Sequence, residues 1–253
     1  MGPVHLGLGL GRLAEALQAR VGYTVVNQGV KVRVDGSLSP ELRLTLRWGH
    51  YERRELDVVR AALQDADVVM EVGAGLGVVS SFCAMAVGSP RVFAYEANPA
   101  MESYIRRTYA LNGVSPGLEM CALSEQGGEQ ALYLGRACWS TTTLSPQEGR
   151  PAIIVPAKRF NDEVRRRAPT LLIVDIEGGE RELCRYGEFA GVRRIVMELH
   201  PATLTPSGRG ELVARMRCAG FRLDEAASDP PVVLFCRRAG PTPPRHAPSD
   251  EGV

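Results

Sequence analysis

The sequence predicts an α/β fold built on a doubly wound, mostly parallel sheet. Short unbroken apolar runs, such as 68–72 and 171–175, have the composition of strands that are covered on both faces. Segments with helical periodicity separate these runs, as crossover connections between parallel strands require. The last two apolar runs, 221–225 and 232–236, are joined by a turn too short for a crossover, so this pair must be antiparallel.

The N-terminal part is predicted to be a separate β unit. Apolar and polar residues alternate over 30–34 and again over 42–46, and the turn dipeptide Asp35-Gly36 lies between them. A period of two is typical of strands with one buried face. We therefore expect residues 1–47 to form a β-hairpin extension.

The main domain is expected to span 48–238. It begins with an amphipathic helix, because Leu56, Val59 and Leu63 recur at helical spacing. A later helix should start near Pro99 with Asn98 as its N-cap. Residues 239–253 are rich in proline and polar groups and are predicted to be a disordered tail. The other expected helices span 178–187 and 208–219, and the expected strands span 68–72, 91–95, 118–123, 131–134, 152–155, 171–175, 193–199, 221–225 and 232–236.

The composition is that of an ordinary globular protein. The formal net charge of +1 gives no bulk attraction to nucleic acid or to an anionic membrane, and we expect neither as a partner. The six cysteines form no C-x-x-C pair and the four histidines form no H-E-x-x-H motif, so no metal site is expected. The N-terminus has no basic region followed by a long apolar run, and we expect a cytoplasmic protein.

A Gly-rich turn carries the strongest functional signal. It occupies 71–77, EVGAGLG, directly after the predicted strand 68–72 and before an apolar helix. Glycines at alternate positions allow a tight turn and close approach of a ligand to the backbone. Glu96 ends the next strand, 23 positions after Gly73, where a carboxylate can accept hydrogen bonds from ribose hydroxyls. Together the turn and the carboxylate indicate a ligand that contains a nucleoside.

The spacing of the glycines in the turn distinguishes between classes of nucleoside-containing ligand. The dinucleotide fingerprint is G-x-G-x-x-G, whereas this turn reads G-x-G-x-G, and no G-K-[ST] follows it. An NAD-dependent oxidoreductase is therefore disfavoured, and so is a P-loop nucleotidase. A binding module without catalytic activity remains an alternative.

The stretch 51–236 resembles the FkbM family of methyltransferases that use S-adenosylmethionine (SAM). The motifs that carry the resemblance are Tyr51-Glu52, EVGAGLG, AYEANP, ALSEQGG, WST, VDIEGGE and VMELHP. The sequence departs from the usual family forms at Glu71, Ala97 and Gly179, which stand in place of Asp, Pro and Ala. These changes are mild and leave cofactor binding plausible.

The resemblance implies a Rossmann-like class I methyltransferase, with a mostly parallel seven-stranded sheet and a final antiparallel strand. It implies SAM as the cofactor and S-adenosylhomocysteine as the product. Some members of the implied cofactor site, notably Tyr51, Ala122 and Leu123, are equally compatible with simple packing. The cofactor-binding residues that the resemblance implies are Tyr51, Glu52, Glu71, Gly73, Ala74, Gly75, Gly77, Glu96, Ala97, Asn98, Ala122, Leu123, Ser124 and Asp175.

Methyl transfer to a hydroxyl benefits from a general base. The candidates are Asp175, Glu177 and His200, which follow two strands expected to end at the same edge of the sheet. An imidazole ordinarily titrates near neutral pH, which would suit His200 for proton removal, although a structural hydrogen bond would also explain a histidine at this position. Trp139 and Ser140 lie in a hydroxyl-rich loop and are candidates for acceptor binding together with His200, although Trp139 could instead cover the sheet edge.

The predicted function is O-methylation of a hydroxyl on a small natural product or sugar. The substrate class comes from the family resemblance alone, and N-methylation of a small molecule stays open. The partner is therefore a small-molecule acceptor. The N-terminal β unit would also allow a homodimer.

Overall fold

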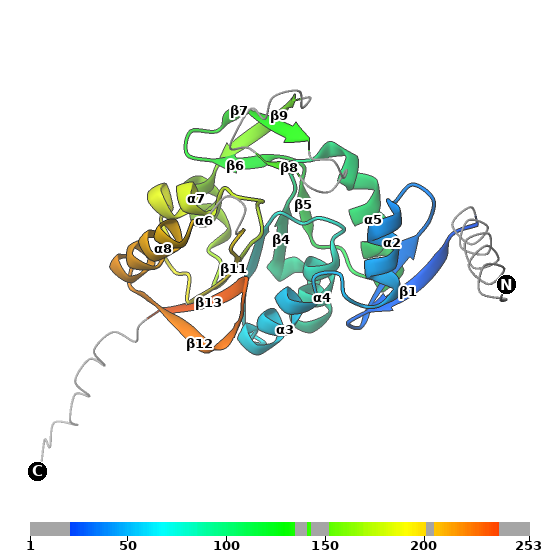
Figure 1. The fold of residues 1–253 in the computed structure, drawn as a ribbon, viewed down its shortest axis with the longest axis horizontal. Coiled ribbons are helices and arrows are strands. Elements are labelled where there is room, and N and C mark those ends of the chain that lie inside the picture. Colours follow the sequence, from blue (N-terminus) through cyan, green and yellow to red (C-terminus); the bar gives the residue numbers. More distant parts are fainter. Residues whose placement is uncertain (1–20, 135–140, 143–151, 201–204, 238–253) are drawn as a thin grey trace, which may run out of the picture.

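The computed structural model describes residues 21–134, 141–142, 152–200 and 205–237 (Figure 1). Three predictions fall outside these residues: the acceptor-site roles of Trp139 and Ser140, the C-terminal tail 239–253, and the first 20 residues of the extension.

A seven-stranded sheet forms the centre of the fold. Its strand order is β12-β13-β11-β10-β3-β4-β5, and only β13 runs in the opposite direction to the other strands of the sheet. The prediction of a mostly parallel sheet with a final antiparallel strand is confirmed. The strands are β3 (Val69–Val72), β4 (Val92–Tyr95), β5 (Gly117–Glu119), β10 (Leu171–Val174), β11 (Arg194–Glu198), β12 (Phe221–Asp229) and β13 (Val232–Arg237).

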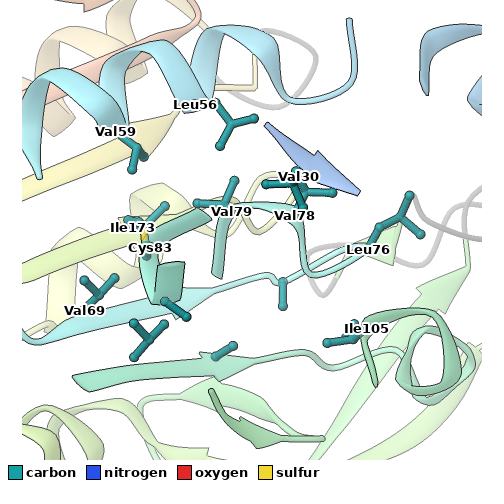
Figure 2. Close-up of a cluster of buried hydrophobic side chains, with 14 of the residues drawn as sticks. Val30, Leu56, Val59, Val69, Leu76, Val78, Val79, Cys83, Ile105 and Ile173 are labelled. Carbon is teal, nitrogen blue, oxygen red and sulfur yellow. The ribbon is translucent and has the colours of Figure 1, made fainter. Parts of the chain in front are cut away.

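Helices cover both faces of this sheet. Alternate residues of one strand enter different cores: Leu171 and Ile173 of β10 pack with α3, α4 and α5, whereas Leu172 and Val174 pack with α6, α7 and α8. Figure 2 shows the first core, where Leu56 and Val59 of α3 face α4 and the strands below. Because both faces are apolar, the strands read as unbroken apolar runs. The helices are α3 (Arg53–Ala62), α4 (Val78–Val87), α5 (Glu102–Asn112), α6 (Phe160–Arg167), α7 (Glu180–Tyr186) and α8 (Pro206–Cys218).

The start of α5 follows the predicted capping. Asn98 accepts a hydrogen bond from the amide of Ala100 and caps the 3-10 turn η2 (Pro99–Met101), which runs directly into α5. Gly113 ends α5 in the left-handed conformation. The range of helix α6 was not predicted, because its apolar positions Phe160 and Val164 are too few to give a clear period.

The predicted hairpin between 30–34 and 42–46 is wrong. Strand β2 (Val30–Val34) instead pairs with β1 (Tyr23–Asn27), and Pro40–Arg47 forms helix α2. Ser39 caps this helix by accepting from the amide of Leu42, and Pro40 occupies its first turn. Leu42 and Leu46 share one buried face, while Leu44 is 45% exposed. The capping residues Ser39 and Pro40 favour a helix here, although the alternation of apolar and polar residues is typical of a strand.

A second, four-stranded sheet lies at the top of the view in Figure 1. Its order is β6-β9-β7-β8, with β6 (Ala122–Ser124), β7 (Gly128–Leu134), β8 (Thr141–Thr142) and β9 (Ala152–Arg159). The predicted strand 118–123 is divided, because β5 pairs with β4 in the central sheet whereas β6 pairs with β9. The strands expected at 131–134 and 152–155 are present and longer. Among the described residues, no helix is both long and apolar enough to cross a membrane.

Candidate active site

The Gly-rich turn leaves β3 and packs against the end of β10. Gly73, Gly75 and Gly77 all have positive φ values, of 92°, 53° and 73°. A Cβ atom on Gly73 would lie 1.7 Å from the carbonyl oxygen of Asp175. Only glycine fits there, so the turn and the residue after β10 are held in direct contact.

Glu96 ties the turn to the end of β4. Its Oε2 accepts from the amide of Gly75 at 2.9 Å, and its Oε1 accepts from the amide of Asn98 at 2.7 Å. The residue is only 6% exposed. Burial raises the pKa of Glu96, while the amide hydrogen bonds oppose that rise. The carboxylate is thus fixed at the position expected for ribose recognition.

A cavity of about 620 Å³ opens at the carboxyl ends of the parallel strands. Open α/β sheets bind their ligands at this edge. The start of α3 and the second sheet contribute further walls. The predicted cofactor and catalytic residues that line the cavity are Tyr51, Glu52, Gly73, Gly75, Glu96, Ala97, Ala122, Leu123, Asp175 and Glu177.

Five predicted cofactor residues support the cavity without lining it. Glu71 accepts from the amide of Ser80 in α4 at 3.2 Å. Gly77 begins α4, Asn98 caps η2, and Ser124 accepts from the amide of Gly127. Ala74 is buried beside them. Some motif residues therefore line the cavity and others only support it, and the sequence motif alone does not show which residues do which.

The start of α3 closes the cavity from the N-terminal side. The Tyr51 hydroxyl accepts from the amide of Leu76 at 3.3 Å, and the buried side chain of Asn27 donates to the Tyr51 carbonyl at 2.9 Å. Glu52 adopts a left-handed conformation, and its buried Oε2 has no hydrogen-bond partner among the described residues. Burial raises the pKa of Glu52 well above its usual range. An unpartnered buried carboxylate oxygen on a cavity wall is suited to a polar ligand.

His200 lies among carboxylates at the ends of β10 and β11. Its Nδ1 is 2.7 Å from Oε1 of Glu180, and its Nε2 is 3.4 Å from Asp175 and 3.5 Å from Glu177. Burial alone would lower the pKa of His200, but the Glu180 hydrogen bond and the charges of Asp175 and Glu177 outweigh it and raise the pKa to about 9. Burial, together with the charge of Glu198, raises the pKa of Asp175 to about 8. The structure therefore brings all three predicted catalytic residues together.

Sequence reasoning missed Glu55 and Glu198, which also line the cavity. Both left a signal. Glu198 stands two positions before His200, so strand alternation directs both toward one face. Glu55 follows Glu52 at helical spacing and is only 4% exposed, although the helix around it is otherwise amphipathic.

Asp175, Glu198 and His200 have ligand-type atoms within 4.8 Å of one another. That spacing suits a divalent cation, but it also suits an ion pair. In the described part of the chain the imidazole faces the carboxylates directly, which accounts for the cluster without an ion.

The cavity fits a cationic ligand that contains a nucleoside. Its walls carry six carboxylates, and the arginines at its edge, Arg53 and Arg54, are exposed. A positively charged sulfonium is stabilised in such a field. The six carboxylates are those of Glu52, Glu55, Glu96, Asp175, Glu177 and Glu198.

The chain was compared with solved structures, curated proteins and family models. Structures with a related fold include a precorrin-6y C5,15-methyltransferase from Geobacter metallireducens GS-15, with 18% identity, a TM-score of 0.41, and coverage of 68% of this chain and 72% of that one. A second is TYW2 from M. jannaschii in complex with AdoMet, with 14% identity, a TM-score of 0.45, and coverage of 87% and 88%. A third is a ribosomal protein L11 methylase from Lactobacillus delbrueckii subsp. bulgaricus, with 12% identity, a TM-score of 0.44, and coverage of 75% and 80%. These identities and scores carry no information about substrate.

No curated protein matches the sequence. The model of the methyltransferase FkbM domain, however, matches residues 71–223, about three fifths of the chain. That match includes the Gly-rich turn, Glu96, Asp175 and His200. The chain therefore belongs to the FkbM methyltransferase family and is a SAM-dependent enzyme.

Proposed function

We propose that the enzyme methylates a hydroxyl group of a small natural product or sugar. The observation that carries the proposal is the position of His200. Its Nε2 lies 3.4 Å from the side chain of Asp175, and Asp175 lines the cavity. A hydroxyl becomes a good nucleophile only as it loses its proton, so a proton acceptor beside the cavity favours oxygen over nitrogen.

The bound cofactor supplies an electrophilic methyl group on a positive sulfur. The chain's own residues supply alignment and exclude water. In this proposal Glu96, which accepts from the amide of Gly75, binds the ribose, and the glycines at 73 and 75 let the ligand approach the backbone closely. In this proposal Asp175 and Glu177 face the sulfonium, and His200, whose Nε2 lies 3.4 Å from Asp175 and 3.5 Å from Glu177, receives the acceptor's proton.

The size of the cavity supports a small acceptor. Its volume of about 620 Å³ falls within the range of small-molecule pockets, about 300–1,000 Å³. The net charge of +1 offers no general attraction for nucleic acid. A cytoplasmic location agrees with the free, buried thiols of Cys83, Cys121 and Cys184. A homodimer stays a prediction.

The test is mass spectrometry of products formed from SAM and paired acceptors that differ only in carrying a hydroxyl or an amine. We expect methylation of hydroxyl compounds. Turnover confined to the amines would establish N-methylation instead. Tight SAM binding with no turnover on any acceptor would favour a non-catalytic module.

A further inference from the structure

Glu180 and His200 form a carboxylate–imidazole pair. Glu180 is the first residue of α7 and is only 1% exposed. Its Oε1 lies 2.7 Å from His200 Nδ1 and also accepts from the amide of Gly178 at 2.9 Å. A carboxylate so placed accepts a hydrogen bond from Nδ1–H and keeps the proton on Nδ1, which leaves Nε2 as the nitrogen that changes protonation.

The Nε2 side of His200 is surrounded by negative charge. Asp175 and Glu177 face it from the β10–α7 loop, and Glu198 lies nearby at the end of β11. Glu52 and Glu55 bring two more buried carboxyl groups close to Asp175 from the start of α3, and burial raises the pKa of each well above its usual range. In the described residues, Asp175 and Glu177 form ion pairs with His200 alone. His200 is thus the basic group that faces these two acidic side chains in the free protein.

The cofactor brings a second cation to the same carboxylates. Two positive charges beside the same carboxyl groups in a partly buried site repel each other. We propose that His200 and the cofactor's sulfonium are alternative cations for Asp175 and Glu177, so that His200 gives up its Nε2 proton when SAM binds and is thereby converted into the base for the acceptor hydroxyl. Glu180 is the positioning residue that fixes the imidazole for this role.

The charges balance through the reaction. As the acceptor oxygen bonds to the methyl carbon, the carbon–sulfur bond breaks and its electron pair stays on sulfur. The hydroxyl proton passes to His200 Nε2. One positive charge leaves sulfur and one appears on the imidazole, so the site keeps the same net charge. This last step rests on the proposed hydroxyl acceptor, whereas the loss of the proton on cofactor binding does not.

The decisive experiment is nitrogen NMR of ¹⁵N-histidine-labelled protein at neutral pH. The chain has only four histidines, and His200→Gln identifies the His200 signal by its loss. We expect imidazolium in the free protein, the neutral Nδ1–H form with SAM, and imidazolium again with S-adenosylhomocysteine, which lacks the sulfonium. Titration calorimetry in buffers of different ionisation enthalpy should show that His200→Gln loses about one released proton per SAM bound.

The positioning role of Glu180 has its own test. Glu180→Gln keeps a hydrogen-bonding group but removes the charge, so His200 should already be neutral at neutral pH, and turnover should depend on pH over a lower range than in the wild type. Glu182→Gln is the matched control, because Glu182 lies on the same helix but is partly exposed and pairs with Arg185. It should leave the His200 signals unchanged.

Several outcomes would overturn the proposal. One is a His200 signal that stays imidazolium with SAM, and another is the same response to SAM and S-adenosylhomocysteine. Turnover that EDTA abolishes and Mg²⁺ restores would also overturn it, since Nε2 would then serve a metal. The NMR measurement needs no acceptor, so failure to find O-methylation would leave its result intact.

Discussion

At the scale of single residues, the site depends on a few positions where no other side chain performs the same task. Gly73 is one, because the carbonyl of Asp175 occupies the space a Cβ would need. Glu96 is another, because each of its oxygens accepts from a different backbone amide. The sequence predicted both residues from motif and spacing. It did not predict that Glu71 of the same motif faces α4 rather than the cavity, because the direction of a side chain depends on the strand's place in the sheet.

Gly73→Ala should lose far more stability than Gly88→Ala. Both glycines have a φ of 92°, a backbone conformation that strains any other residue by about 1–3 kcal/mol, so both variants carry strain of this kind. The Cβ at position 73 would also collide with Asp175, whereas nothing lies within 4 Å of a Cβ at position 88. Denaturant unfolding of the two variants measures the difference. Equal losses would mean that the turn is not pressed against β10.

Glu96→Ala should weaken SAM binding by about ten- to a hundredfold, because a hydrogen bond to a charged group contributes about 1.5–3 kcal/mol. Calorimetric dissociation constants provide the measurement. Glu102→Ala is a suitable control, since Glu102 lies six positions further on, is partly exposed and pairs with Arg106. Unchanged affinity in Glu96→Ala would remove Glu96 from the ribose site.

At the scale of elements, apolar pattern and capping gave most of the structure. Runs covered on both faces identified β3, β10, β11 and β13. The pattern failed at 40–47, where three leucines at every second position fit a strand, while the first and third of them also fit one side of a helix. The N-cap Ser39 and Pro40 were the signal that could have decided it. Strand pairing was harder, since nothing local shows that β5 and β6 belong to different sheets.

Leucine truncations test helix α2 directly. Leu46 is fully buried, so Leu46→Ala should cost about 2–5 kcal/mol of unfolding free energy. Leu44 is 45% exposed, so Leu44→Ala should cost less than about 1 kcal/mol. A strand would place both leucines on the same face, and similar losses would then be expected.

At the scale of the whole molecule, the N-terminal elements and the sheet act together on one cavity. Strand β2 is fixed to α5 through Asn112, which bonds both the amide and the carbonyl of Lys31 at 2.8 Å. Asn27 of β1 then holds Tyr51 at the cavity wall. The strand alternation and the Gly-rich turn allowed the sheet edge and cofactor to be predicted. The acceptor could not be predicted, because selectivity depends on which side chains from distant elements come together around the cavity, and the sequence does not show this.

The carboxyl groups in and around the cavity also predict how the stability of the protein depends on pH. Asp175 and Glu71 have pKa values raised to about 8, mainly because burial disfavours their charged forms. A raised pKa contributes stability that is complete below the unfolded value and is lost as pH rises through the folded one. For these two groups the loss therefore runs from about pH 4 to about pH 8, and for His200 from about 6.5 to about 9.

Bound SAM should oppose this loss, because its positive charge favours ionised carboxylates and a neutral imidazole. The rise in melting temperature caused by saturating SAM should therefore be larger near about pH 8.5 than near about pH 6. S-adenosylhomocysteine differs by the absence of the sulfonium charge, so its stabilisation should vary much less with pH. Thermal unfolding with each ligand at both pH values makes the comparison. A pH dependence identical for the two ligands would show that the carboxylates do not respond to the sulfonium, whereas a dependence seen with SAM alone would tie the charge of the cavity to the cofactor it holds.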